Sequence, residues 1–255
     1  MKNVAIVGAS GFIGGHLTTR YKSVRKFRRD NIFDLKNDDS ELTIIAAAPA
    51  EKWKANANPI EDLINIKKLI ESLKCLEERK CVLISTVDVY PVGLKFDEDA
   101  PLPIDHPEPY GANRGFLERS LLEIIQDLHI LRLPGMYGPG LKKNLIFDLL
   151  NGTVPPKLNL LSSFQFYDVR MLPYHIERVL NINIPALNLA TEPILVDEIY
   201  KHCFDASGKD FEVASIHYGM ETKFALQVAG REGRYLYSKI EILSGIRQWV
   251  KESQK

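Results

Sequence analysis

Three glycines at regular spacing follow the first apolar run of the chain, at Gly8, Gly11 and Gly14. In a strand-to-helix turn, the first glycine permits the tight bend and the second lets the backbone approach a pyrophosphate. The third lets helix and strand pack closely. The N–H groups that open the helix attract phosphate charge. The spacing therefore predicts a dinucleotide-binding turn, with a purely structural glycine-rich turn as the alternative.

Short apolar runs and helical stretches alternate around this turn. Each run is bounded by turn or polar residues and lacks period-two alternation, which is typical of strands buried on both faces. The expected strands are residues 4–7, 42–47, 81–85 and 130–133, and the expected helices are 12–21, 60–76 and 111–128. This alternation predicts an α/β fold with a Rossmann-type doubly wound parallel sheet.

The alternation becomes less regular after Leu133, where prolines and glycines punctuate the chain. We therefore expect a Rossmann domain over 1–140 and a small mixed α/β substrate-binding region over 141–255, partly interleaved with the main sheet. Expected elements of the second region are helices at 145–150, 196–204 and 239–251 and strands at 164–169 and 186–189. The first domain is unusually short between 21 and 42, with room only for brief strands at 23–27 and 29–33.

Composition and charge restrict the class of protein. The chain has 255 residues, of which 45% are hydrophobic and 26% charged, so a globular protein with a sizeable core is expected. Basic and acidic residues balance at 33 each, which favours neither nucleic acid nor a membrane as partner. Three scattered cysteines and histidines without ligand spacing predict no metal site and a reducing compartment. No signal-peptide pattern or membrane-length apolar run occurs, so we expect a soluble, cytoplasmic protein.

Further motifs follow the glycine turn in order along the chain. They are Asp34-Leu35, Ala47-Ala48, Asn65, the run from Ser85 to Tyr90, Tyr110 with Arg114, and the run from Leu131 to Gly140. Together with the turn, they resemble the motifs of the extended short-chain dehydrogenase/reductases, the NAD-dependent epimerase/dehydratase family that acts on nucleotide sugars. The resemblance covers most of the chain and implies NADP or NAD as cofactor.

The resemblance also implies which residues hold the cofactor. Asp34 and Leu35 would bracket the adenine, while Ala47 and Ala48 would end a strand that passes under the cofactor. The implied cofactor-binding residues are Gly8, Ser10, Gly11, Phe12, Ile13, Gly14, Asp34, Leu35, Ala47, Ala48, Asn65, Pro134 and Met136.

Basic residues lie where the family chooses between NAD and NADP. Arg25 and Arg28 belong to this stretch, and no acidic residue occupies the expected strand end to receive a ribose 2′-hydroxyl. A 2′-phosphate suits arginine, so the stretch favours NADP and both arginines are predicted cofactor ligands. The alternative is a solvated run of charge on an edge strand.

A hydroxyl, a tyrosine and a cation would carry the chemistry that the resemblance implies. Tyr110 would give or take a proton at a sugar hydroxyl, and Thr86 would polarise the substrate oxygen. A free tyrosine titrates near pH ~10, so it needs a nearby cation to stabilise its phenolate. The family carries lysine four residues later, on the same helix face, whereas this chain has Arg114, a predicted ribose clamp. The alternatives are a strand-end threonine bonded to backbone and an amphipathic tyrosine at a helix start.

Two polar residues are predicted to contact substrate, Asp88 and Asn144. Asp88 would otherwise face solvent, and Asn144 would otherwise be part of a polar loop before a helix. Dehydratases of the family carry an Asp-Glu pair directly after the threonine, but this chain has Val87 and Asp88 there. A 4,6-dehydratase is therefore not expected.

These interpretations lead to one principal function and one alternative. We expect an NAD(P)-dependent oxidoreductase or epimerase that reduces or epimerises a nucleotide-linked sugar. The alternative is a catalytically impaired dinucleotide-binding protein that acts as a redox sensor or assembly partner, because Arg114 replaces the usual lysine. The helix after Tyr110 packs across a two-fold axis in related enzymes, so a homodimer is expected, although burial within one chain also explains its apolar residues.

Overall fold

The apolar runs form a six-stranded parallel sheet in the order β10-β6-β4-β3-β1-β2. The computed structural model describes residues 3–153, 158–208 and 213–254. The strands of this sheet are β1 (Val4–Val7), β2 (Val24–Phe27), β3 (Leu42–Ile45), β4 (Lys80–Thr86), β6 (Asp127–Leu133) and β10 (Ala186–Asn188). Every residue of β1 and β3 is buried, which explains why these strands show no period-two alternation.

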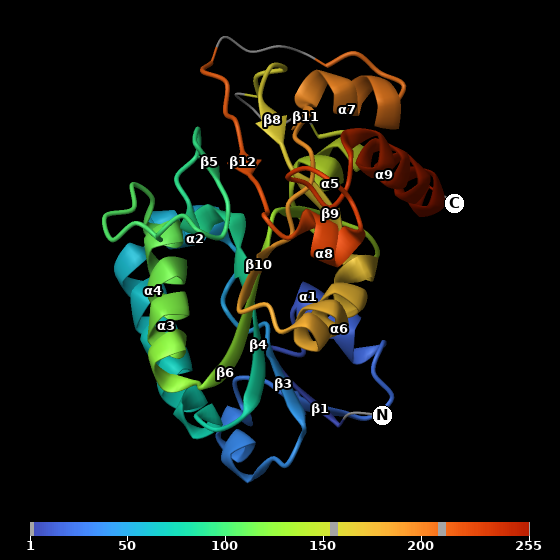
Figure 1. Cartoon of the computed structure of the whole chain (residues 1–255). Helices are drawn as coiled ribbons and strands as arrows, with labels where there is room; N and C mark the ends of the chain where they lie inside the picture. The colour runs from blue at the N-terminus through green and yellow to red at the C-terminus, as the bar shows by residue number, and fades with distance from the viewer. Residues whose placement is uncertain (1–2, 154–157, 209–212, 255) are drawn as a thin grey trace. The chain divides into compact units, whose positions relative to one another are not determined.

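Helices cover both faces of this sheet, as expected of a doubly wound fold. Figure 1 shows α3 (Pro59–Leu73) and α4 (Pro109–Ile124) on one face and α1 (Phe12–Thr18) and α6 (Leu172–Ile182) on the other. Helices α3 and α4 both begin with proline, whose fixed φ suits the first helical turn. A short helix, α2 (Lys52–Ala57), precedes α3.

The chain divides into two compact units, each built from three segments that alternate along the sequence. Unit 1 comprises Met1–Pro91, Pro101–Arg132 and Leu172–Leu187, and unit 2 comprises Val92–Ala100, Leu133–Met171 and Asn188–Lys255. Unit 1 holds the large sheet and its helices. The sequence predicts a boundary at residue 140, with the second region partly interleaved with the main sheet; in the structure, Leu172–Leu187 returns α6 and most of β10 to unit 1.

Unit 2 is built from short strand pairs and helices. Its pairs are β5 (Lys95–Phe96) with β12 (Gly219–Met220), β7 (Gly135–Tyr137) with β9 (Phe166–Asp168), and β8 (Ser163–Phe164) with β11 (Ile194–Leu195). Its helices are α5 (Leu145–Leu150), α7 (Val196–Cys203), α8 (Ala225–Ala229) and α9 (Lys239–Ser253). Helices α7 and α9 lie side by side, and their buried faces share one apolar core.

Several expected elements are corrected by the structure. The strand expected at 29–33 is wrong, because Asn31 turns the chain by accepting the Arg28 N–H at 2.6 Å, and Ile32–Asn37 forms a 3-10 helix, η1. The helix expected to reach residue 128 ends at Ile124, and Asp127 opens β6. The strand expected at 164–169 is divided at Gln165 into β8 and β9. The buried side-chain amide of Gln165 donates to two backbone carbonyls.

Candidate active site

The glycine turn lies at the point where the order of strands reverses. Gly8 follows β1, which pairs with β2 on one side and β3 on the other. Its φ is +88°, and a Cβ there would lie 2.3 Å from the Ala46 carbonyl oxygen. A Cβ on Gly14 would lie 2.2 Å from the Gly8 carbonyl oxygen. Both positions therefore require glycine, for the bend and for close packing of α1 respectively.

Gly11 differs from its two neighbours because its side faces open space. A Cβ built there would meet only the Gly8 carbonyl oxygen, at 3.4 Å, which is an ordinary contact. Ser10 and Gly11 are exposed, and Phe12 and Ile13 are half-buried at the start of α1. The turn thus leaves room for a ligand against its backbone, as a pyrophosphate requires.

The predicted adenine side lies next to this turn. The Phe27 carbonyl at the end of β2 accepts hydrogen bonds from the N–H groups of Gly8 and Ala9, at 2.9 and 3.3 Å, and so anchors the glycine turn. Arg28 is the residue directly after Phe27. Arg28 is exposed. Arg25, in contrast, pairs with Asp38 and Asp39 at 3.3 and 2.9 Å.

The other predicted cofactor residues of unit 1 occupy the elements that follow. Asp34 is exposed on η1, whereas Leu35 is fully buried in the core of the sheet. Ala47 and Ala48 are half-buried just beyond the end of β3, and Asn65 is half-buried on α3.

Tyr110 is held at the start of α4 by backbone packing. A Cβ on Gly111 would lie 2.2 Å from the Asp88 carbonyl oxygen, so this glycine lets α4 approach the segment after β4. The Tyr110 N–H donates to Asn56 Oδ1 at 2.9 Å. These contacts place a buried tyrosine beside the carboxyl end of β4, where Thr86 lies.

The surroundings of Tyr110 oppose ionisation of its hydroxyl. Burial is the main cause and raises its pKa above the ordinary value for tyrosine. The charge of Arg114 and the hydrogen bonds of Tyr110 with Arg114 and Thr86 lower the pKa, but they compensate only in part. The guanidinium carbon of Arg114 lies 4.3 Å from the centre of the tyrosine ring. The sequence prediction that these three side chains meet is therefore matched by the geometry, while their roles stay predictions.

Arg114 is fixed by contacts within unit 1. Its Nη1 donates to Asp62 Oδ2 at 2.6 Å, and its Nη2 donates to Asp62 Oδ1 at 3.0 Å and to the Pro49 carbonyl at 2.5 Å. Asn113 Nδ2 also donates to Asp62, at 2.8 Å. Arg114 Nε is buried and has no partner among the described residues. Both terminal nitrogens are thus engaged by protein, and Arg114 also forms a hydrogen bond with Tyr110.

Asp88 is also paired rather than free. Lys52 Nζ lies 2.8 Å from Asp88 Oδ1 and 2.6 Å from Glu108 Oε2, and Thr86 Oγ1 donates to Asp88 Oδ2 at 3.1 Å. Sequence reasoning missed Lys52 and Asp62, because no local pattern links them to residues 36 to 56 positions away. Gly111 was also missed, although a glycine directly after the key tyrosine was a usable signal.

A second buried ion pair lies on the sheet side of α4. Glu118 is fully buried and accepts two Arg132 nitrogens, including Nη2 at 2.7 Å. Arg132 also donates to the Tyr90 hydroxyl, and Ser85 donates to Glu118. This network joins α4 to β4 and β6 behind the residues described above.

Three predicted site residues belong to unit 2. Pro134 is buried, and Met136 is half-buried in β7. Asn144 caps α5: its Oδ1 accepts the Phe147 N–H at 3.2 Å and its Nδ2 donates to the Met136 carbonyl at 2.6 Å. Its φ of 132° is unusual for a residue with a side chain.

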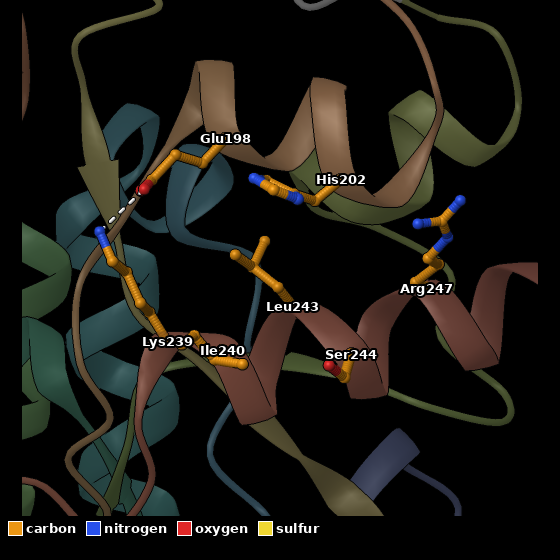
Figure 2. A pocket seen from close by; sticks show the side chains of 7 residues that line it. All are labelled: Glu198, His202, Lys239, Ile240, Leu243, Ser244 and Arg247. Carbon is orange, nitrogen blue, oxygen red and sulfur yellow. Dashed lines mark hydrogen bonds and ion pairs between the residues drawn. The ribbon is translucent and has the colours of Figure 1, made fainter.

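A surface hollow of about 240 Å³ lies between α7 and α9 of unit 2. Figure 2 shows its lining, with a 2.8 Å ion pair between Lys239 Nζ and Glu198 Oε1 at one end. It contains none of the predicted site residues.

Over the described ranges, no helix is long and apolar enough to cross a membrane, and no group of His, Cys, Asp and Glu side chains could hold a metal ion.

Comparison with known proteins identifies the fold. No protein-family model and no curated protein matches the chain. Among solved structures, MoeE5 in complex with UDP-glucuronic acid and NAD is 22% identical, with a TM-score of 0.76 over 98% of this chain and 99% of that chain. The dTDP-4-dehydrorhamnose reductase from Bacillus anthracis str. Ames in complex with NADP is 17% identical, with a TM-score of 0.75 over 98% of each chain.

A third similar structure is the UDP-N-acetylglucosamine 4-epimerase from Methanobrevibacter ruminantium M1 in complex with UDP-N-acetylmuramic acid. It is 18% identical, with a TM-score of 0.75 over 100% of this chain and 99% of that chain. The likeness spans whole chains, so the Rossmann-type fold expected from the sequence is confirmed.

Proposed function

We propose that this chain is an NAD(P)-dependent oxidoreductase or epimerase that acts on a nucleotide-linked sugar. The observation that carries the proposal is that unit 1 holds both a glycine turn and a buried tyrosine on one parallel sheet. A glycine turn with an open Gly11 lies at the strand-order reversal of a parallel sheet, and a buried tyrosine meets a threonine hydroxyl beside β4 of the same sheet. Ligands of doubly wound sheets bind at the carboxyl ends of the strands.

The residues present fit a dinucleotide. The pyrophosphate would lie against the backbone of Ser10, Gly11, Phe12 and Ile13. The space beside Gly11 is open because this residue has no side chain to fill it. When bound, the nicotinamide ring supplies or accepts a hydride. Arg28 favours NADP, since it is exposed next to the residue that anchors the turn. Arg25 is a weaker candidate because two carboxylates already engage it.

The proton chemistry is assigned to Tyr110. Its hydroxyl would exchange a proton with the reacting oxygen of the sugar, while Thr86 would orient that oxygen. Arg114 would act on Tyr110 through its hydrogen bond and its ring contact, while Asp62 and the Pro49 carbonyl hold its terminal nitrogens.

The substrate class is proposed from the comparisons. MoeE5 was solved in complex with UDP-glucuronic acid, and the epimerase from Methanobrevibacter ruminantium M1 in complex with UDP-N-acetylmuramic acid, so a nucleotide sugar is the natural candidate. Asp88 and Asn144 remain the proposed substrate contacts. Asp88 would act together with Lys52, and the unusual backbone of Asn144 supports a functional role there.

We further propose a cytoplasmic homodimer. Apolar side chains are exposed on the outer helices of unit 1, notably Ile60 at 75% and Trp53 at 71%, with Ile64 and Leu122 about half exposed. A second copy of the chain would cover them. Light scattering at micromolar concentration should give twice the mass of the chain, and a monomeric mass would contradict the dimer.

Cofactor binding tests the first part of the proposal. Gly11→Val should fold normally, because the backbone there is extended, with φ −74° and ψ 170°. It should abolish NADPH binding in calorimetry, since the side chain occupies the ligand space. Gly15→Ala is the matched control, because a Cβ there meets nothing closer than 3.8 Å. Unchanged affinity in folded Gly11→Val would contradict the proposal.

Turnover tests the second part. Tyr110→Phe should abolish reduction of 4-keto nucleotide sugars, measured by NADPH absorbance, while leaving NADPH affinity nearly intact. Tyr174→Phe is the control, because that tyrosine is half exposed on α6. Wild-type binding of NADPH without turnover of any nucleotide sugar would favour the alternative, a dinucleotide-binding protein without catalysis.

A further inference from the structure

Asp62 has no direct contact with Tyr110 among its described hydrogen bonds, but it holds the cation that does. Its two carboxylate oxygens accept both terminal nitrogens of Arg114, in the bidentate geometry that fixes a guanidinium most firmly. Both partners are almost completely buried, with side chains 3% and 6% exposed. The pair is therefore one rigid unit without net charge.

We infer that Asp62 is a positioning residue that acts through Arg114: it neutralises the guanidinium, so that Tyr110 stays a neutral phenol and serves as a proton donor for carbonyl reduction. The inference deepens the proposed function and rests on it for the identity of the proton acceptor. It concerns which direction of proton transfer the site favours.

The charges around Tyr110 leave no surplus of positive charge. On its own helix and the preceding loop are Arg114, Glu108 and His106; α3 contributes Asp62 and α2 contributes Lys52, while Asp88 follows β4. Two permanent cations and three carboxylates thus lie on the elements around Tyr110. A phenolate needs a net positive neighbourhood, which this arrangement does not supply.

The direction of the pKa shift agrees with this geometry. Burial raises the pKa of Tyr110, and the Arg114 charge lowers it only in part. A phenol that keeps its proton at neutral pH can donate it but cannot act as a base.

The proposed step is balanced by a reduced nicotinamide cofactor. The carbonyl carbon of a keto sugar receives a hydride from that cofactor, which becomes oxidised. The carbonyl π electrons form the new O–H bond with the proton of Tyr110 Oη. The product is an alcohol, and the resulting tyrosinate takes back one proton from solvent, so the reduction consumes one proton overall.

Titration of Tyr110 itself tests the inference without any substrate. The protein is labelled with 13Cζ-tyrosine, and the Tyr110 signal is identified by its absence in Tyr110→Phe. Asp62→Asn should lower the pH midpoint of this signal by about one unit or more, because the guanidinium charge is no longer neutralised. Glu61→Gln, at the exposed neighbouring position, should leave the midpoint unchanged. An unchanged or raised midpoint in Asp62→Asn would overturn the inference.

A double variant keeps the test decisive if Asp62→Asn does not fold. Asp62→Leu with Arg114→Met replaces the buried pair by apolar side chains of similar size, a change that proteins often tolerate. If the pair acts as a neutral unit, only the hydrogen bond from Arg114 to Tyr110 is lost, so the midpoint should rise by no more than about one unit. A rise of about two units or more would show that Arg114 acts as a free cation and would overturn the inference.

The pH profile separates this inference from the proposed function. In active enzyme, the alkaline limb of reduction should move to lower pH in Asp62→Asn, together with the NMR midpoint. An enzyme with no turnover but with the expected NMR shifts would reject the proposed function and support the role of Asp62. If the enzyme is active but Asp62→Asn changes neither the alkaline limb of reduction nor the NMR midpoint of Tyr110, the inference is rejected and the proposed function stands.

Discussion

Charged side chains are used differently in the two units. In unit 1, Arg114 and Arg132 are buried, and each is matched to a carboxylate that is itself buried. In unit 2, the Arg231–Glu241 and Arg247–Asp205 pairs leave 40% or more of each side chain exposed. Burial makes a pair costly to break and precise in position, whereas an exposed pair is screened and replaceable. These two buried pairs of unit 1 thus hold the region of the candidate site, whereas the two pairs of unit 2 lie at the surface.

Removing Glu118 should give the largest effect. Glu118→Ala removes the buried carboxylate that neutralises Arg132, which typically costs about 3–5 kcal/mol of unfolding free energy. Urea unfolding measures the loss. Glu123→Ala is the matched control, being an exposed glutamate on the same helix, and should change stability by less than about 0.5 kcal/mol. Equal effects of the two substitutions would break the comparison between buried and exposed charge.

Arg28 sharpens the comparison, because it is an exposed charge inside unit 1. Arg28→Ala should leave stability unchanged but weaken NADPH binding about tenfold, which corresponds to about 1.4 kcal/mol. NADH binding should be unaffected. Arg25→Ala is the control, since its guanidinium already pairs with Asp38 and Asp39. The calorimetric preference for NADPH should also shrink with salt. Equal affinities for NADPH and NADH in the wild type would assign Arg28 to the solvated surface.

The smallest effect is expected at Glu241 of unit 2. Its hydrogen bond with Arg231 lowers its pKa from 4.5 to about 2. A lowered pKa stabilises the fold above the ordinary pKa of the carboxyl, and that stability is lost as pH falls from about 4.5 towards 2. Glu241→Gln should therefore cost less than about 1 kcal/mol at pH 7 and almost nothing near pH 2. Urea midpoints at both pH values measure this, and a constant difference would contradict it.

Sequence reasoning succeeded where the information was local. The glycine turn could be predicted because three positions within seven residues determine its backbone, and Tyr110 and Arg114 meet because four helical residues make one turn. The strand expected at 29–33 failed because the side chain of Asn31 bonds the backbone and turns the chain.

The candidate site was predictable only in part. Asp62 lies 52 positions before Arg114, so only the packing of α3 against α4 brings them together. Helix α6 was missed altogether, although its buried residues Leu172, Ile176 and Val179 recur at helical spacing. No spacing rule indicated which unit the segment around α6 would join.

The Arg114–Asp62 pair also limits how this protein can evolve. A mutation of Arg114 to lysine provides one point of charge where Asp62 and the Pro49 carbonyl need a planar fork. A mutation of Asp62 first strands a guanidinium in the interior. Each single substitution should therefore lower stability, whereas replacement of both residues can be close to neutral, so the two positions are expected to change together.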